Sequence, residues 1–220
     1  MGAIARRWGA LYLLDACQSV GQMPLDVNRV GCHMLSATSR KFLRGPRGTG
    51  FLYVSQGLIN QLEPPLLDLH AATWIGPDRY EIRPDARRFE NWETNYAAKI
   101  GLAVAIDYAL SWGMDSIWSR VSLLAQELRQ RLDEIPRVTV RDLGRERCGI
   151  VTFSVDVKRP EEIRQALHSV QMNVSASPAR FTLLDMQSRG LQDGLVRASV
   201  HYYNTSDEID RFCRALQEMT

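Results

Sequence analysis

The sequence lacks the features that mark secreted, membrane-spanning and zinc-binding proteins. Its four cysteines lie far apart and form no CxxC pair, so we expect neither a disulfide framework nor a metal site, and a reducing, cytoplasmic setting. No apolar run approaches the roughly 18 residues that a transmembrane helix needs. The first ten residues, "MGAIARRWGA", also lack the apolar core of a signal peptide. We therefore expect no membrane partner.

A strong charge of one sign is also missing. The 27 Lys and Arg residues nearly balance the 25 Asp and Glu residues, which leaves a net charge of +2 and no bias toward nucleic acid. Repeats and low-complexity tracts are absent too. What is present is an ordinary globular composition, with 45% hydrophobic residues in 220 positions. A chain of this length can form one large domain or two modest ones.

Short, continuous apolar segments dominate the first part of the chain. They predict three buried strands, over residues 10–16, 32–39 and 48–55, of the kind found in a sheet covered on both faces. Residues 56–90 are rich in proline and charge, so we expect an irregular surface segment there. The sequence therefore predicts an α/β fold with an incomplete large domain over residues 1–100.

The second part of the chain alternates amphipathic helices with strands. Helices are expected over 95–113 and 114–135, followed by strands at 137–142 and 149–156, a helix over 159–170, and strands at 172–177 and 195–203. A final helix should begin at Thr205 or Ser206, either of which can cap it. Residues 101–220 are thus predicted to contain a linking helix and a smaller α+β domain.

Three polar residues stand where two of the first strands end. Asp15 and Gln18 follow the first strand and Lys41 follows the second, and ligands of open α/β sheets bind outside the carboxyl ends of strands. Pyridoxal phosphate needs an amine for its aldehyde and a carboxylate for its pyridine nitrogen. Taken alone, Asp15 reads as a turn or cap residue and Lys41 as a solvated cation. Together they favour a cofactor site.

Two segments carry a family resemblance. "DACQSVGQMPLDV" and "SATSRKFLRGPRGTGFLYV" closely resemble the cofactor-binding core of the class V aminotransferase family. This family of fold-type I pyridoxal-phosphate enzymes includes cysteine desulfurases, selenocysteine lyases, isopenicillin N epimerases and sulfoxide lyases. The resemblance continues through "RRFENWETNYAAKIGLAVAIDYAL" and "LVRASVHYYNTSDEIDRF", and so extends over nearly the whole chain.

The resemblance implies a role for each polar residue near these strands. Lys41 matches the Schiff-base lysine, which would also abstract the substrate's Cα proton. Asp15 matches the carboxylate at the pyridine nitrogen, and Gln18 matches the residue that hydrogen-bonds the ring oxygen. Thr38 matches a phosphate-binding hydroxyl. Arg40 stands where the family has a phosphate-binding histidine, and a guanidinium suits a dianion at least as well.

Farther along the chain, the resemblance implies one more role and reveals two departures. Arg197 matches the arginine that binds the substrate carboxylate. Glu93, with Thr94 beside it, stands where many relatives have a threonine that reaches the partner subunit's phosphate. Desulfurases carry a catalytic cysteine in the segment that corresponds to residues 172–190, and this chain has none there. A persulfide-forming desulfurase is therefore not expected.

Length sets this chain apart from its family. Members carry well over a hundred residues before the point that matches Met1, so the resemblance is to the carboxyl-terminal portion only. We expect a homodimeric enzyme that acts on an amino acid as a transaminase or carbon–sulfur lyase. A non-catalytic fragment or assembly module is the alternative. "GPRGTG" is not a nucleotide loop, because it leads into a strand rather than a helix. His33 and His201 are expected to be structural.

Overall fold

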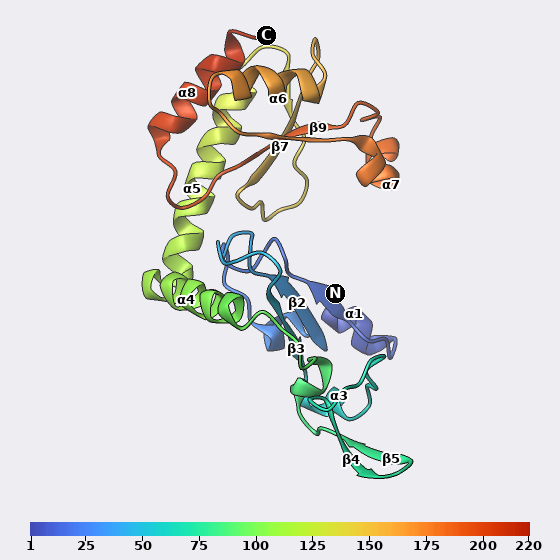
Figure 1. The fold of residues 1–220 in the computed structure, drawn as a ribbon. Coiled ribbons are helices and arrows are strands. Elements are labelled where there is room, and N and C mark those ends of the chain that lie inside the picture. The colour runs from blue at the N-terminus through green and yellow to red at the C-terminus, as the bar shows by residue number, and fades with distance from the viewer. The chain divides into compact units, whose positions relative to one another are not determined.

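The computed structural model describes all 220 residues, which form two compact units, residues 1–114 and 115–220 (Figure 1). The boundary expected from the sequence, at residue 100, falls inside helix α4 (Tyr96–Trp112), which belongs entirely to the first unit. None of the helices combines the length and the apolar character that crossing a membrane requires.

The first unit is built on a three-stranded sheet with the order β1-β2-β3. Strand β1 runs parallel to β2, and β3 runs antiparallel to it. All three predicted strands are present, as β1 (Leu13–Asp15), β2 (Met34–Thr38) and β3 (Gly50–Val54). Short helices lie between or beside them, namely α1 (Gly2–Arg7), α2 (Val27–Val30) and α3 (Gln56–Ile59).

Residues 56–90 are more ordered than the sequence predicts. They contain a hairpin, β4 (Ala72–Gly76) and β5 (Arg79–Ile82), and a 3-10 turn, η1 (Ala86–Phe89). The expectation of an irregular segment was wrong here. Trp74, Ile75 and Tyr80 are all exposed, so the strands bury no face that would give an alternating pattern. The hairpin is instead held at its base, where the Arg83 amide donates to the Ala71 carbonyl at 3.0 Å.

Helix α4 begins and ends where the sequence predicts. The Asn95 side chain caps it by accepting from the Ala98 amide at 3.0 Å, and Gly113 ends it with a φ of 79°. Leu102 and Ala109 are buried on one side of the helix. Its other side carries a row of exposed apolar residues four apart: Tyr96, Ile100, Val104, Tyr108 and Trp112.

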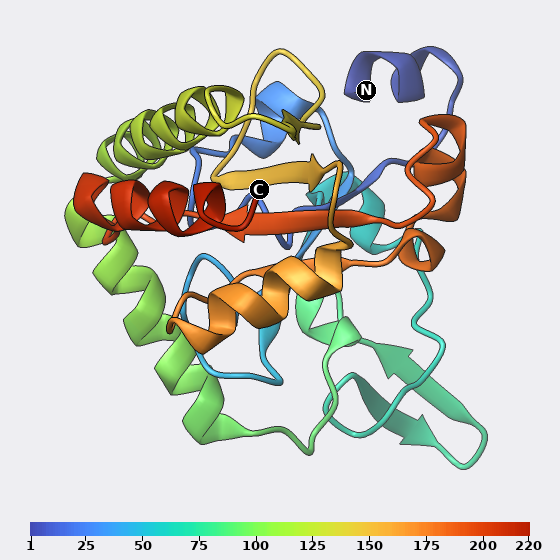
Figure 2. The same ribbon diagram turned by 90° about the horizontal axis from the view of Figure 1, so that it is seen from above.

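The second unit is an antiparallel sheet packed against helices. The strand order is β6-β7-β9-β8, and every neighbouring pair is antiparallel. Helix α6 lies alongside β9 and packs against α8 (Figure 2). The elements are α5 (Met114–Asp133), β6 (Val138–Val140), β7 (Ile150–Val155), α6 (Pro160–Ser169), β8 (Ser175–Ser177), η2 (Ala179–Phe181), α7 (Leu183–Ser188), β9 (Leu195–Ser199) and α8 (Ser206–Gln217).

This unit has a continuous core of its own. Alternate residues of β7 (Val151, Phe153 and Val155) are buried and meet apolar residues of α5, α6, β9 and α8. One face of the sheet is thus packed while the other carries polar residues, as is common in antiparallel sheets. Thr205 caps α8 as expected, and its hydroxyl accepts from the Glu208 amide at 3.2 Å. Strand β9 stops at Ser199, four residues before the predicted end.

Candidate functional site

The first part of the site is the carboxylate at the end of β1. Asp15 lies opposite Ser36 in the parallel register with β2, and its side chain is exposed. The chain then turns, and the fully buried Ala16 donates its amide to the Ser36 carbonyl at 2.8 Å. The Cys17 amide in turn donates to Asp15 Oδ1 at 2.9 Å. These bonds fix the position of the carboxylate relative to β2.

The second part is the loop between β2 and β3, which carries Lys41. Ser39 is fully buried, and its hydroxyl contacts the Thr49 hydroxyl at 2.7 Å and the Pro46 carbonyl. The Gly45 amide donates to the Ser39 carbonyl at 2.9 Å, and the Arg44 amide donates to the Lys41 carbonyl at 2.9 Å. The loop is therefore closed on itself, with the Lys41 side chain half-buried at its surface.

The two parts contact each other through a glycine. Gly21 has a φ of 89°, and a Cβ placed on it would lie 2.6 Å from the Leu43 nitrogen. Such a distance is too short for any side chain, so only glycine lets the turn after β1 reach the Lys41 loop. Beside it, the buried Gln22 donates its side-chain amide to the Gln18 carbonyl, which ties the turn together.

Electrostatic effects link the two parts as well. Hydrogen bonds from the Cys17 thiol and amide lower the pKa of the Asp15 carboxyl, and the positive charge of Lys41 lowers it further. The same bond to the Asp15 carboxylate raises the pKa of the Cys17 thiol. Asp15 is thus ionised at neutral pH. The Lys41 amine makes no hydrogen bond or ion pair in the chain, so nothing competes with a ligand for it.

The remaining expected cofactor residues surround this pair. The Thr38 hydroxyl lies 3.5 Å from the Thr49 carbonyl, and Arg40 is exposed and has no side-chain partner. The Gln18 side chain is half-buried and free of hydrogen bonds. The structure brings Asp15, Thr38 and Lys41 to one region. It adds Cys17, whose only signal in the sequence is its place between Asp15 and Gln18.

Arg197 belongs to the second unit. It lies in β9, between Thr152 of β7 and Ser175 of β8. Its neighbours Val196 and Ala198 are buried in the core, whereas Arg197 points to the other face and is half-buried. The guanidinium has no hydrogen bond or ion pair within the chain. It is free to bind a carboxylate.

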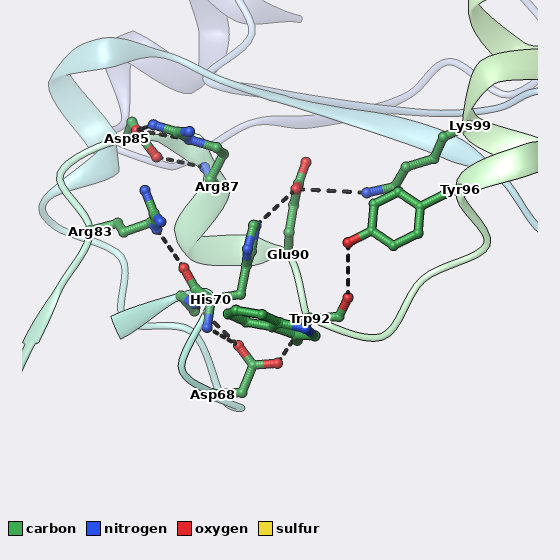
Figure 3. Close-up of polar contacts among 10 residues, drawn as sticks. Asp68, His70, Arg83, Asp85, Arg87, Glu90, Trp92, Tyr96 and Lys99 are labelled. Carbon is green, nitrogen blue, oxygen red and sulfur yellow. Dashed lines mark hydrogen bonds and ion pairs between the residues drawn. The ribbon is translucent and has the colours of Figure 1, made fainter. Parts of the chain in front are cut away.

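The segment around Glu93 is held by a network of polar contacts (Figure 3). Asp68 accepts from the Trp92 amide at 2.7 Å and from the His70 amide at 2.9 Å, and these bonds, that of Trp92 first, lower the pKa of the Asp68 carboxyl. His70 Nε2 lies 3.3 Å from Glu90, which also lies 3.7 Å from the Lys99 amine. Glu93 itself is exposed and unpaired.

The histidines named from the sequence have structural contacts. His33 Nδ1 accepts from the Tyr12 amide at 3.0 Å and thereby joins the starts of β1 and β2. His201 is buried, and its ring stacks on Tyr203 with 4.5 Å between centroids. Across the chain, no group of three or more histidine, cysteine or acidic side chains is placed to hold a metal ion.

Comparison with known proteins places this geometry in a family. The family model for aminotransferase class V matches residues 1–212. A "probable cysteine desulfurase" of Methanothermobacter thermautotrophicus is 32% identical over this whole chain, and one of Pyrococcus abyssi is 30% identical. The chain covers 55% and 54% of these two proteins, so it spans about half the length of the curated relatives that it matches.

Solved structures agree with the sequence comparison. The apo structure of a cysteine desulfurase from Thermococcus onnurineus matches 99% of this chain with a TM-score of 0.91 and 29% identity, over 54% of its own length. A C-DES mutant with glycine linked to its pyridoxal phosphate cofactor matches 98% of this chain with a TM-score of 0.84 and 22% identity, over 55% of its own length. The fold is thus that of fold-type I pyridoxal-phosphate enzymes over about half of their length. The chain belongs to the class V aminotransferase family.

Proposed function

We propose that this chain is the lysine-bearing part of a pyridoxal-phosphate enzyme that acts on an amino acid. One observation carries the proposal. An unpaired amine, Lys41, and an ionised carboxylate, Asp15, come from the ends of two neighbouring strands and influence each other electrostatically. The relatives named above, two probable cysteine desulfurases and one solved cysteine desulfurase, support the same interpretation.

The residues present fit this cofactor. Lys41 offers an amine with no competing partner, and Asp15 keeps one carboxylate oxygen, Oδ2, free of backbone bonds for the pyridine nitrogen. The Thr38 hydroxyl and the exposed Arg40 guanidinium would hold the phosphate, and the unbonded Gln18 amide would meet the ring oxygen. When bound, the cofactor supplies an electron sink for the bonds at the substrate's Cα.

The chain's own residues would orient the substrate and move its proton. A negative charge on Asp15 keeps the pyridine nitrogen protonated, and the low pKa of that carboxyl preserves the charge at working pH. The Lys41 amine would accept the proton from Cα at its Nζ. Arg197, half-buried and unpaired, would bind the carboxylate of the amino acid.

Two reaction outcomes are proposed, transamination and carbon–sulfur lysis. Both begin with the same proton abstraction. The desulfurase relatives favour sulfur chemistry. However, residues 172–190 contain no cysteine to accept the sulfur, and the two cysteines of the second unit are the buried Cys213 and the half-buried Cys148. We therefore propose a lyase or transaminase that forms no persulfide on that segment.

We also propose a cellular location and an oligomeric state for the protein. All four cysteines are free, which suits the reducing cytoplasm that we propose as its location. We also propose a homodimer, because the hairpin and α4 expose large apolar side chains, among them Trp74, Tyr80, Ile100 and Trp112.

An absorbance titration tests the proposed function. Pyridoxal phosphate joined to a protein lysine absorbs in the visible, so adding the cofactor should give a new band with wild-type chain. Lys41→Ala should abolish that band and Lys99→Ala should leave it unchanged. A band of equal size in Lys41→Ala would contradict the proposal.

The assembly-module alternative is favoured by one observation, that the chain spans about half the length of its relatives. It makes the opposite prediction. In that case no substitution of Asp15 or Lys41 would change the binding of pyridoxal phosphate.

A further inference from the structure

Arg197 lies in a row of polar side chains that crosses the sheet of the second unit. Thr152 of β7 lies opposite it on one side and Ser175 of β8 on the other. The Thr152 amide donates to Asp142 Oδ1 at 2.8 Å, and the Thr152 carbonyl accepts from the Arg141 amide at 2.7 Å, so both backbone groups of Thr152 point away from β9. Thr152 and Arg197 are therefore a pair without backbone hydrogen bonds between them. Side chains lie closest in pairs of this type, with about 4.5–5.5 Å between the Cβ atoms.

The Thr152 hydroxyl has a fixed polarity, because it is bonded to a carboxylate. Its Oγ1 donates to Asp142 Oδ1 at 2.6 Å. An ionised carboxylate only accepts hydrogen bonds, so the hydroxyl proton lies on the Asp142 side. The lone pairs of Oγ1 are left to accept a hydrogen bond, and no second proton is left to donate. A guanidinium only donates, so Thr152 offers Arg197 the kind of group that a guanidinium can bond.

A buried ion pair keeps Asp142 in this role. Arg129 Nε lies 2.6 Å from Asp142 Oδ2, and only 9% of each side chain is exposed. Arg129 also donates to the carbonyls of Cys148 and Ile150, at 2.8 and 3.1 Å, so the guanidinium is held in place. Both oxygens of Asp142 thus have partners, Oδ2 in Arg129 and Oδ1 in the amide and hydroxyl of Thr152. The negative charge bonded to Thr152 is already neutralised by a buried cation.

We propose that Thr152 is a positioning residue for Arg197. When a carboxylate binds, the Thr152 hydroxyl oxygen accepts one N–H group of the Arg197 guanidinium and orients the other donors of the planar fork toward that carboxylate. The ion pair between Arg129 and Asp142 keeps the hydroxyl in the accepting orientation. This inference rests on the carboxylate-binding role that the proposed function gives to Arg197. The polarity of the Thr152 hydroxyl does not depend on that role.

A titration with acetate, used as a simple carboxylate probe, tests the proposal on the cofactor-free chain. Nitrogen-15 NMR of the Arg197 side chain gives the dissociation constant of acetate at that residue. Thr152→Val keeps the branched shape and removes the hydroxyl, so the constant should rise about three- to tenfold, the usual effect of losing one hydrogen bond. Thr152→Ser keeps the hydroxyl and should restore the wild-type constant.

Thr139→Val is the matched control. Thr139 lies opposite Ser154, which shares a face of β7 with Thr152, and its own hydroxyl makes no hydrogen bond in the chain. The substitution removes the same hydroxyl group from the neighbouring strand and should leave acetate binding unchanged. An unchanged constant in Thr152→Val would overturn the positioning role.

The wild-type chain decides the question if Thr152→Val does not fold. Acetate should shift the carbon-13 signal of Thr152 Cβ over the same concentrations as the Arg197 signal, and should leave that of Thr139 Cβ in place. A shift at Arg197 without one at Thr152 would overturn the proposal. No response at Arg197 itself would contradict its carboxylate-binding role in the proposed function, and the inference with it, whereas the absorbance band tests the cofactor at Lys41 separately.

Discussion

The two units differ in how completely they bury their own apolar residues. In the second unit, residues of three strands and three helices around Phe153 and Leu124 form a continuous core of 18 buried residues. In the first unit, buried residues gather in smaller clusters, such as the group of four around Leu35 and the group of three around Leu58.

An apolar pocket in the first unit shows the same difference between the two units. An apolar cavity of about 370 Å³ lies in the first unit between the turn after β1, the sheet and α4, lined among others by Val20, Leu35 and Leu110. This pocket is open to solvent, so the first unit leaves its apolar lining uncovered. The unit that carries Asp15 and Lys41 is therefore the one that depends most on further packing. The comparison teaches that the second unit is stabilised by its own core, whereas the site unit is organised by hydrogen bonds in its turns.

The largest expected effect comes from the core of the second unit. Phe153 is fully buried and makes an edge contact with Phe212, with 6.3 Å between centroids. Phe153→Ala should lower the free energy of unfolding of this unit by about 3–5 kcal/mol, since it removes a buried ring and leaves a cavity. Leu35→Ala in the first unit borders an existing cavity and should cost about 2 kcal/mol. Denaturant unfolding, with hydrogen exchange as the readout in each unit, would measure the loss of stability in both variants. A larger loss for Leu35→Ala would reverse the comparison.

The next effect concerns the glycine that joins the two parts of the site. Gly21→Ala should destabilise the first unit by about 2–5 kcal/mol, because the new methyl group meets the Leu43 backbone and φ is positive. Gly9→Ala is the matched control, with a φ of 61° and open space around it, and should cost about 1–2 kcal/mol. Hydrogen exchange at residues 41–45 should rise in Gly21→Ala only. Equal protection in both variants would show that the close approach is unimportant.

A smaller effect on the stability of the second unit should depend on pH. Burial raises the pKa of the Cys213 thiol to about 11, and the nearby Asp210 carboxylate adds to this rise while the Arg131 charge opposes it. The folded state thus keeps a proton that the unfolded chain releases above its ordinary value of 9.0. The resulting stability is present below pH 9 and is lost as pH rises toward 11, by at most about 1.4 kcal/mol per pH unit.

Cys213→Ala isolates this contribution. The variant should be less stable at neutral pH but should lose less stability than the wild type between pH 9 and 11, as followed by urea unfolding. Parallel curves for the two proteins would show that the thiol does not titrate in the folded state as described.

The smallest effect on the free energy of unfolding is expected for substitutions in the row of exposed apolar residues on α4. Ile100→Gln together with Val104→Gln should change the free energy of unfolding by less than about 0.5 kcal/mol per site, because both side chains already face solvent. The same change should reduce self-association, since it breaks an apolar patch. Sedimentation velocity would report the change. A large loss of stability would mean that these residues are buried in the folded chain.

Much of this arrangement could be predicted from the sequence, for local reasons. The three strands of the first unit are short apolar runs, and Thr205 and Asn95 are cap residues placed directly before periodic helices. The positions of Asp15 and Lys41 after strand ends could be predicted for the same reason, because each follows a short apolar run. Their roles in binding the cofactor stay predictions.

What could not be predicted depends on contacts between distant residues. The β4–β5 hairpin buries almost nothing, so its sequence shows no alternation, and it is held at its base by residues such as Arg83. Ser39 and Gly21 are small residues whose importance comes only from what packs against them. Cys17 acts on Asp15 through the geometry of a turn, which no spacing rule reveals.

The most direct test of the central claim is borohydride reduction of the chain with pyridoxal phosphate, followed by peptide mapping. The chain has three lysines, so Lys99, paired with Glu90, and Lys158, in the second unit, serve as internal controls. We predict that pyridoxyl mass is fixed to the Lys41 peptide well above either control, and that Asp15→Asn weakens this preference. Equal labelling of the three lysines would contradict the assignment of Lys41 and the site built around it.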